Sequence, residues 1–179
     1  MLYICTAVRK RINEGTRSPL FLYLKMFEDT VRELLEDCLE ERQDLFLIDF
    51  SISENKAIKV VIDGDNGVLV DDCVLVSRAI EHNLDREEVD FSLEVTSAGA
   101  TSPLTHKRQY IKNIGRTLQV KTIDKQTYDA NLVEANDSEI KLSWKAREPK
   151  PVGKGKVTVT KEAAIAYNNI EKAKVKIKF

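Results

Sequence analysis

VVIDGDNGVLVDDCVLVSRAIEHNLDREEVDFSLEVTSAGATSPL, residues 60–104, is the stretch that decides how this chain folds. Around its start, Ile58, Val60 and Ile62 place an apolar side chain at every second position, which predicts a β-strand. The strand ends at residues 63–67, where two glycines and an asparagine permit a tight turn.

A helix and a second strand follow this turn. Asp71 or Asp72 lies where a helix N-cap is favoured, because a carboxylate accepts hydrogen bonds from the free N–H groups of the first turn. Alternation over residues 91–96 predicts the second strand. Between them, one helical stripe is formed by Cys73, Val76, Ser77, Ile80 and Leu84.

The residues before this stretch are predicted to form a helix and a hairpin that complete a domain with it. Residues 27–43 carry apolar side chains on one helical face and acidic residues in the first turn, which predicts an amphipathic helix. Residues 46–52 alternate as a strand, which a short turn joins to the strand at residues 57–63 as a hairpin. The compact arrangement is an α/β domain over residues 26–104, a three-stranded sheet with two helices on one face.

The pattern changes after Pro103. A short helix, capped by Thr105, is predicted to serve as a hinge over residues 105–115. Residues 116–179 then alternate with a period of two in five short segments, which predicts a small β-barrel and an α+β fold class. A helical turn is predicted at residues 163–172. The alternating positions are Leu118 and Val120; Tyr128, Ala130 and Leu132; Ile140, Leu142 and Trp144; Val157 and Val159; Val175, Ile177 and Phe179.

Many positions of residues 60–104 keep the order and spacing of a known family: Val60, Ile62, Asp63, Gly67, Val68, Asp71, Asp72, Cys73, Ser77, Arg78, Leu93, Glu94, Val95, Ser97, Gly99, Pro103 and Leu104. By these positions, the stretch resembles the bacterial RimP family of ribosome maturation factors. The resemblance covers about residue 27 to the C-terminus, and the chain departs from the family's usual Pro, Asp and Arg at Ala98, Thr101 and Ser102. It implies that the C-terminal barrel is SH3-like.

The first part of the chain stands outside this resemblance. Residues 1–25 show no clean period and carry five basic residues and one acidic residue. We expect a basic N-terminal extension that is disordered or lies upstream of a natural start at Met26. An arm that contacts RNA is the alternative interpretation.

The charges are divided between the two predicted domains. Residues 26–105 hold six basic and twenty acidic residues, a net charge of −14, whereas residues 106–179 hold seventeen basic and eight acidic residues, a net charge of +9. Because nucleic acid is a polyanion, this asymmetry favours an RNA contact for the C-terminal part alone.

No residue pattern supports catalysis or a cofactor. The turn at residues 64–67 has the GxxG spacing of a KH loop, but its interior is acidic or neutral where phosphate requires positive charge. An EF-hand pattern beginning at Asp63 lacks its later ligands. Nine helical positions separate Cys73 from His82 and place them on opposite sides of the helix, so a Cys-His nucleophile is not expected. We predict no metal site, no cofactor and no enzyme activity.

The localisation prediction rests on the cysteines and on the apolar segments. The chain has three widely spaced cysteines, which offer no disulfide framework or metal-binding pair. Its longest apolar run, residues 20–24, is too short to span a bilayer, and its basic residues follow the first apolar segment where a signal peptide has them first. We predict a cytoplasmic monomer without a membrane partner.

The functional prediction rests on the basic residues of the C-terminal part. Between Trp144 and Val157, five cations and one glutamate occupy a predicted loop that contains proline and glycine. The resemblance implies a factor that binds the immature 30S subunit, with 16S rRNA and ribosomal protein S12 as partners. A free-standing RNA-binding regulator with an Sm-like barrel is the alternative, and a hydrolase in the acidic domain is a third. The candidate contact residues are Arg78, Arg116, Lys121, Lys145, Arg147, Lys150, Lys154 and Lys156.

Overall fold

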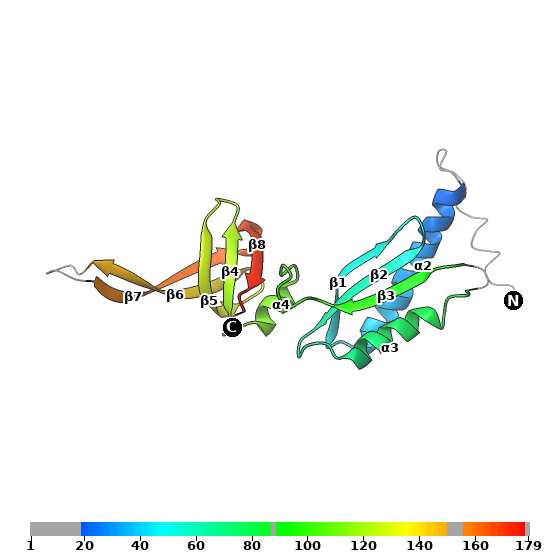
Figure 1. Ribbon diagram of the computed structural model, residues 1–179, viewed down its shortest axis with the longest axis horizontal. Coiled ribbons are helices and arrows are strands. Elements are labelled where there is room, and N and C mark those ends of the chain that lie inside the picture. The colour runs from blue at the N-terminus through cyan, green and yellow to red at the C-terminus, as the bar shows by residue number, and fades with distance from the viewer. Residues whose placement is uncertain (1–18, 87–88, 150–155, 178–179) are drawn as a thin grey trace.

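The computed structural model describes residues 19–86, 89–149 and 156–177, and its helices and strands form two groups along the chain (Figure 1). The N-terminal group contains α2 (Pro19–Glu41), β1 (Leu45–Ile52), β2 (Ala57–Gly64), α3 (Val70–Glu81) and β3 (Ser92–Ser97). The C-terminal group contains α4 (Lys107–Lys112), β4 (Thr117–Thr122), β5 (Thr127–Ala135), β6 (Glu139–Pro149), β7 (Lys156–Ala166), a 3₁₀ turn (Tyr167–Asn169) and β8 (Ile170–Val175). The α+β class is confirmed.

Helix α2 is longer at its N-terminal end than the sequence predicted. It begins at Pro19, whereas the predicted helix covered residues 27–43, so the boundary predicted at residue 25 falls inside a helix. Proline is well tolerated in the first helical turn, because its missing N–H has no partner there in any case. Residues 1–18 lie outside the described residues, and the prediction for them stays a prediction.

The first sheet has the order β1-β2-β3, with β2 at its centre. Strands β1 and β2 form the expected antiparallel hairpin, and β3 pairs with β2 in parallel after the crossover through α3. Val60 of β2 lies opposite Phe50 on one side and Val95 on the other. The predicted three-stranded sheet is confirmed.

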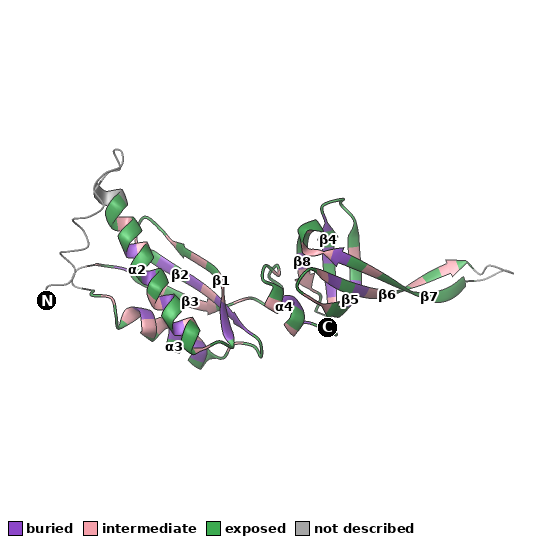
Figure 2. Cartoon of the chain, turned by 180° about the vertical axis from the view of Figure 1, so that it is seen from behind, coloured by how far each residue is buried: buried purple, intermediate pink, exposed green. Residues whose placement is uncertain are grey.

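One hydrophobic core joins this sheet to both helices. Alternate residues of β2 are buried, so one face of the sheet is covered. They share a single cluster with residues of α2 and of α3, so both helices cover that same face, as Figure 2 shows. The fully buried members are Val31, Leu35, Ile58, Val60, Ile62, Val76 and Ile80.

The second sheet has five strands in the order β7-β6-β5-β4-β8, all of whose pairs are antiparallel. Its core contains Leu118, Val120, Leu132, Ile140 and Leu142, onto which Tyr110 of α4 packs. Within the described part of the chain, the outer strands β7 and β8 do not pair with each other, so closure into an SH3-like barrel stays a prediction.

Two details of this sheet were predicted wrongly. The segment predicted as a helical turn, residues 163–172, completes β7, makes one short 3₁₀ turn and begins β8. Strand β8 ends at Val175, so Ile177 follows the strand that the alternation predicted, and Phe179 lies outside the described residues. Ala163 and Ile165 pack toward the core from β7, which explains the strand.

The loop predicted between Trp144 and Val157 is also wrong for its described residues, 145–149 and 156, because they belong to a β-hairpin. Strand β6 continues to Pro149 and β7 begins at Lys156, with an unbroken register from Glu139 opposite Ala166 to Pro149 opposite Lys156. We call the outer part of this hairpin, residues 144–149 and 156–161, the arm. Figure 1 shows the arm extending away from the rest of the second sheet.

We predict that Leu35→Ala strongly destabilises the first domain. The Leu35 side chain is fully buried between α2 and the sheet, and truncating such a leucine costs about 2–5 kcal/mol in lost burial and cavity formation. Urea unfolding followed by circular dichroism measures the change. Leu22→Ala on the same helix is the matched control, since Leu22 is exposed, and equal effects of the two variants would contradict this packing.

Candidate functional site

The arm presents a cationic face and an apolar face. Paired residues of an antiparallel ladder point to the same side of a sheet. Lys145 lies opposite Thr160, Arg147 opposite Thr158, and Lys156 opposite Pro149, which places the three cations and both threonines on one face. The other face carries Trp144, Ala146, Val157 and Val159.

The three cations of this face are not neutralised within the described part of the chain. Lys145, Arg147 and Lys156 are exposed, and no described acidic side chain pairs with them. By contrast, Lys161 on the opposite face pairs with Glu148, 2.5 Å between Nζ and Oε1. The cationic face of the arm therefore has positive charge available for an anionic partner.

The other predicted contact residues are placed differently. Arg78 is exposed on α3 of the first domain, and Arg116 is exposed just before β4. Lys121 on β4 pairs with Glu171 of β8 at 2.8 Å. Lys150 and Lys154 lie outside the described residues. The structure thus brings together Lys145, Arg147 and Lys156, and it places Arg78 in the other domain.

A second polar cluster, which the sequence did not predict, joins α4 to the turn after β2. Arg108 donates from Nε to Asp65 Oδ1 at 2.9 Å and from Nη2 to the Gln43 carbonyl at 2.7 Å. Lys112 pairs with Asp63, and Gln109 Nε2 donates to Asp63 Oδ2 at 3.0 Å. We call this cluster the junction. It holds α4 against the first domain while Tyr110 packs into the core of the second.

Ring contacts of Phe46 pack beside the junction, and one of the rings, that of His106, also caps the start of α4. His106, and not Thr105 as predicted, is the N-cap: its Nδ1 accepts from the Arg108 N–H at 3.2 Å. The His106 ring lies 4.9 Å from the Phe46 ring, and the Arg108 guanidinium lies 4.5 Å from the same ring. Burial and the nearby Arg108 charge lower the pKa of His106, so it stays neutral and keeps Nδ1 as an acceptor.

A third ion-pair group fixes the start of α3. The helix begins after Leu69. The Asp72 carboxylate, in the first turn, accepts a hydrogen bond from the Leu69 N–H at 2.8 Å and so stabilises the start of the helix. Arg42 bridges Asp72 at 2.8 Å and Asp44 at 2.9 Å. The Leu69 hydrogen bond, followed by Arg42, lowers the pKa of Asp72.

The residues weighed for catalysis do not form a site. Burial, with a smaller effect of Asp72, raises the pKa of the Cys73 thiol, which opposes a nucleophilic role. Gly67 has a φ of 95°, as a tight turn requires. No group of three or more His, Cys, Asp or Glu side chains among the described residues could hold a metal ion.

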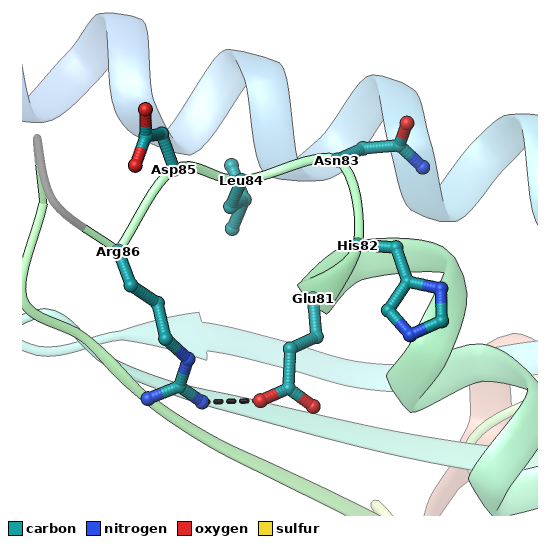
Figure 3. A pocket seen from close by; sticks show the side chains of 6 residues that line it. All are labelled: Glu81, His82, Asn83, Leu84, Asp85 and Arg86. Atoms are coloured by element: carbon teal, nitrogen blue, oxygen red, sulfur yellow. Dashed lines mark hydrogen bonds and ion pairs between the residues drawn. The ribbon is translucent and has the colours of Figure 1, made fainter.

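A surface hollow lies at the end of α3. It is lined by residues 81–86, and Figure 3 shows the Arg86 guanidinium paired with the Glu81 carboxylate across it. His82 points away from this pair in the same view. The hollow brings no nucleophile and base together. No helix in the described segments is long and apolar enough to cross a membrane.

These features define a two-domain α+β protein in which an ion-paired junction connects an acidic domain to a basic five-stranded sheet with a projecting arm. The family model described as the RimP N-terminal domain matches residues 34–101. Ribosome maturation factor RimP of Christiangramia forsetii is 60% identical over 154 residues, covering 86% of this chain and 100% of that protein. The corresponding protein of Flavobacterium psychrophilum is 53% identical over 153 residues, covering 86% and 99%. The chain belongs to the RimP family of ribosome maturation factors.

We predict that Lys112→Met destabilises the protein more than an ordinary surface change. It leaves the Asp63 carboxylate, which is 6% exposed, without its cation, and breaking a buried pair in this way costs about 3 kcal/mol or more. Urea unfolding measures the loss. Lys172→Met removes an exposed lysine from β8 as the matched control, and an equal effect of both variants would contradict the junction.

We also predict that Asp72 makes the stability acid-sensitive. Because the folded-state pKa of Asp72 lies below its ordinary value of 3.8, its stabilisation is complete above that value and is lost as the pH falls through the folded-state pKa. Unfolding of wild type and Asp72→Asn is compared from neutral pH to about pH 3. The stability difference should shrink below about pH 4, and a constant difference would exclude this role. Asp71→Asn, one residue earlier and exposed, is the control.

Proposed function

We propose that this chain is a non-catalytic ribosome assembly factor of the cytoplasm that binds the immature 30S subunit and promotes its maturation. Two relatives that match over most of the chain carry the name ribosome maturation factor RimP, which supports the role. The observation that carries the binding mode is the arm, whose Lys145, Arg147 and Lys156 lie together without acidic partners among the described residues.

The arm suits the phosphates of folded 16S rRNA. Two successive outward positions on one strand lie roughly 7 Å apart, so Lys145 and Arg147 can each meet a different phosphate. Thr158 and Thr160 add hydroxyl groups opposite them on β7. Most polar contacts of a protein to a nucleic acid go to phosphate and sugar, which position the protein without reading the sequence. Such a contact is suited to holding an immature surface.

The acidic domain has a different role in this proposal. Its net charge of −14 over residues 26–105 repels phosphate, so it meets protein and not RNA. Ribosomal protein S12 is the partner that the resemblance to the family implies. Factor binding then steadies the immature surface until later components join it, and no bond of a substrate is made or broken.

A free-standing RNA-binding regulator is the second candidate. It is favoured by the small five-stranded antiparallel sheet, which would be Sm-like or SH3-like if its ends close. Sedimentation of cell lysate through a sucrose gradient distinguishes these two functions, and also the hydrolase, by where the protein travels. An assembly factor travels with free small subunits, whereas a regulator travels with small RNAs and a hydrolase stays at the top of the gradient.

We predict that reversing the cations of the arm weakens binding to immature small subunits and reduces its salt dependence. Each lost phosphate contact removes up to about 0.9 units from the slope of log affinity against log salt. Lys145→Glu, Arg147→Glu and Lys156→Glu together should make the slope shallower by about two to three units. Binding measured over a salt series gives both values. Thermal stability should change little, because exposed charges contribute about 0–1 kcal/mol each.

The control variant carries the same charge change elsewhere on the second domain. It combines Lys161→Glu, on the other face of the arm, with Lys172→Glu and Lys174→Glu of β8. It should keep most of the affinity. If both triple variants weaken binding equally, bulk charge and not the cationic face of the arm is responsible.

A further inference from the structure

The outer side of α3 carries an unusual group of exposed apolar side chains. Leu69 is 71% exposed and Val70 79%, and Val74 and Leu75 are 37% and 38% exposed. Val70 and Val74 are four residues apart, so they lie on the same side of the helix. We call these four residues the α3 patch. Several exposed apolar side chains within one short segment are typical of an interaction site, whereas single exposed apolar residues are ordinary.

The α3 patch is not needed for the core of its own domain. Val76 and Ile80, on the opposite side of α3, are fully buried and supply its packing. The start of the helix is held by Asp72 and Arg42 instead. Polar side chains at positions 70 and 74 would therefore serve the fold as well as valine does.

Exposed carboxylates gather at the C-terminal end of α2, close to where α3 begins. Both helices cover one face of the sheet, and the bond between Arg42 and Asp72 brings the C-terminal end of α2 to the N-terminal end of α3. The last two turns of α2 expose Glu36, Asp37, Glu40 and Glu41, none of which is ion-paired among the described residues. Figure 2 shows the exposed sides of the two helices next to each other.

These carboxylates lie where the helix itself disfavours them. The C-terminal end of a helix carries partial negative charge, so an anionic side chain there costs a few tenths of a kcal/mol to about 1 kcal/mol. No basic residue lies in the last turn of α2. A positively charged partner would remove this repulsion.

We propose that the α3 patch and the last two turns of α2 form a docking surface for a positively charged protein segment with apolar side chains. The proposal rests on the proposed function and names the surface by which the acidic domain meets a basic ribosomal protein. The valines and leucines would be buried in the contact, and the carboxylates of α2 would pair with the partner's cations. RNA is disfavoured, because phosphate would meet these same carboxylates.

Photo-crosslinking identifies what covers the patch. Benzoylphenylalanine replaces Val70, which is exposed enough to accept the larger ring, and the full chain is irradiated on purified immature small subunits. A crosslink to a basic ribosomal protein supports the proposal. A crosslink to 16S rRNA, or none, overturns it. The same amino acid at Val133, an exposed valine of β5, is the control for position.

Two sets of variants test the apolar and the charged parts separately. Val70→Ser with Val74→Ser should weaken binding by about tenfold or more and leave the salt slope unchanged, because no cation is removed. Glu40→Lys with Glu41→Lys should also weaken binding, whereas an RNA partner would be bound more tightly. Glu54→Lys with Glu94→Lys makes the same charge change outside both helices and corrects for bulk attraction.

The outcomes separate this proposal from the function on which it rests. If the wild type binds immature subunits and both sets of variants bind as tightly, the docking surface is overturned and the function stands. If the wild type does not bind immature subunits at all, the function fails and the proposal fails with it. Circular dichroism and thermal unfolding of each variant show that a lost contact is not a lost fold.

Discussion

The contact between Lys112 and Asp63 is the interaction on which the arrangement of the two domains depends. Asp63 lies one residue before the end of the central strand of the first sheet and is 6% exposed, so its charge requires a partner. Lys112 and Gln109 supply that partner from α4. Because Tyr110 of the same helix belongs to the core of the second sheet, one helical turn is fixed to both domains. The predicted hinge segment thus makes specific contacts on both sides.

This junction gives the two oppositely charged domains a defined relation. Without the junction, only the backbone at residues 105 and 106 would connect a domain of net charge −14 to one of net charge +9. Electrostatic attraction between the two domains would then bring their surfaces together in many orientations. Arg108 and Lys112 use two of the basic residues for this contact. The cations of the arm lie on a different element, β6 and β7, and stay available. Pairing at the junction therefore leaves the cations of the arm without acidic partners among the described residues.

Periodicity predicted the parts of the fold that bury an apolar face. Ile58, Val60 and Ile62 marked β2 correctly, and the stripe through Val76 and Ile80 marked α3. The junction left no such mark, since Asp63 and Lys112 are 49 positions apart and an ion pair has no sequence period. The arm was missed for a related reason: among the described residues, none between Leu142 and Ile165 is buried, and proline and glycine suggested a loop. Its three described cations were nevertheless identified, because charge is visible in composition.

The arm is a two-stranded surface that has no hydrophobic core of its own. A two-stranded hairpin alone is marginally stable, and ordering each residue costs about 1–2 kcal/mol in backbone entropy. This arm is the continuation of a ladder whose inner part is anchored by Ile140, Leu142 and Ile165, so its register is set before any partner arrives. The exposed cations of the arm contribute little to its stability, because exposed charges are worth about 0–1 kcal/mol each. The face with Lys145, Arg147 and Lys156 can therefore stay cationic without disturbing the fold.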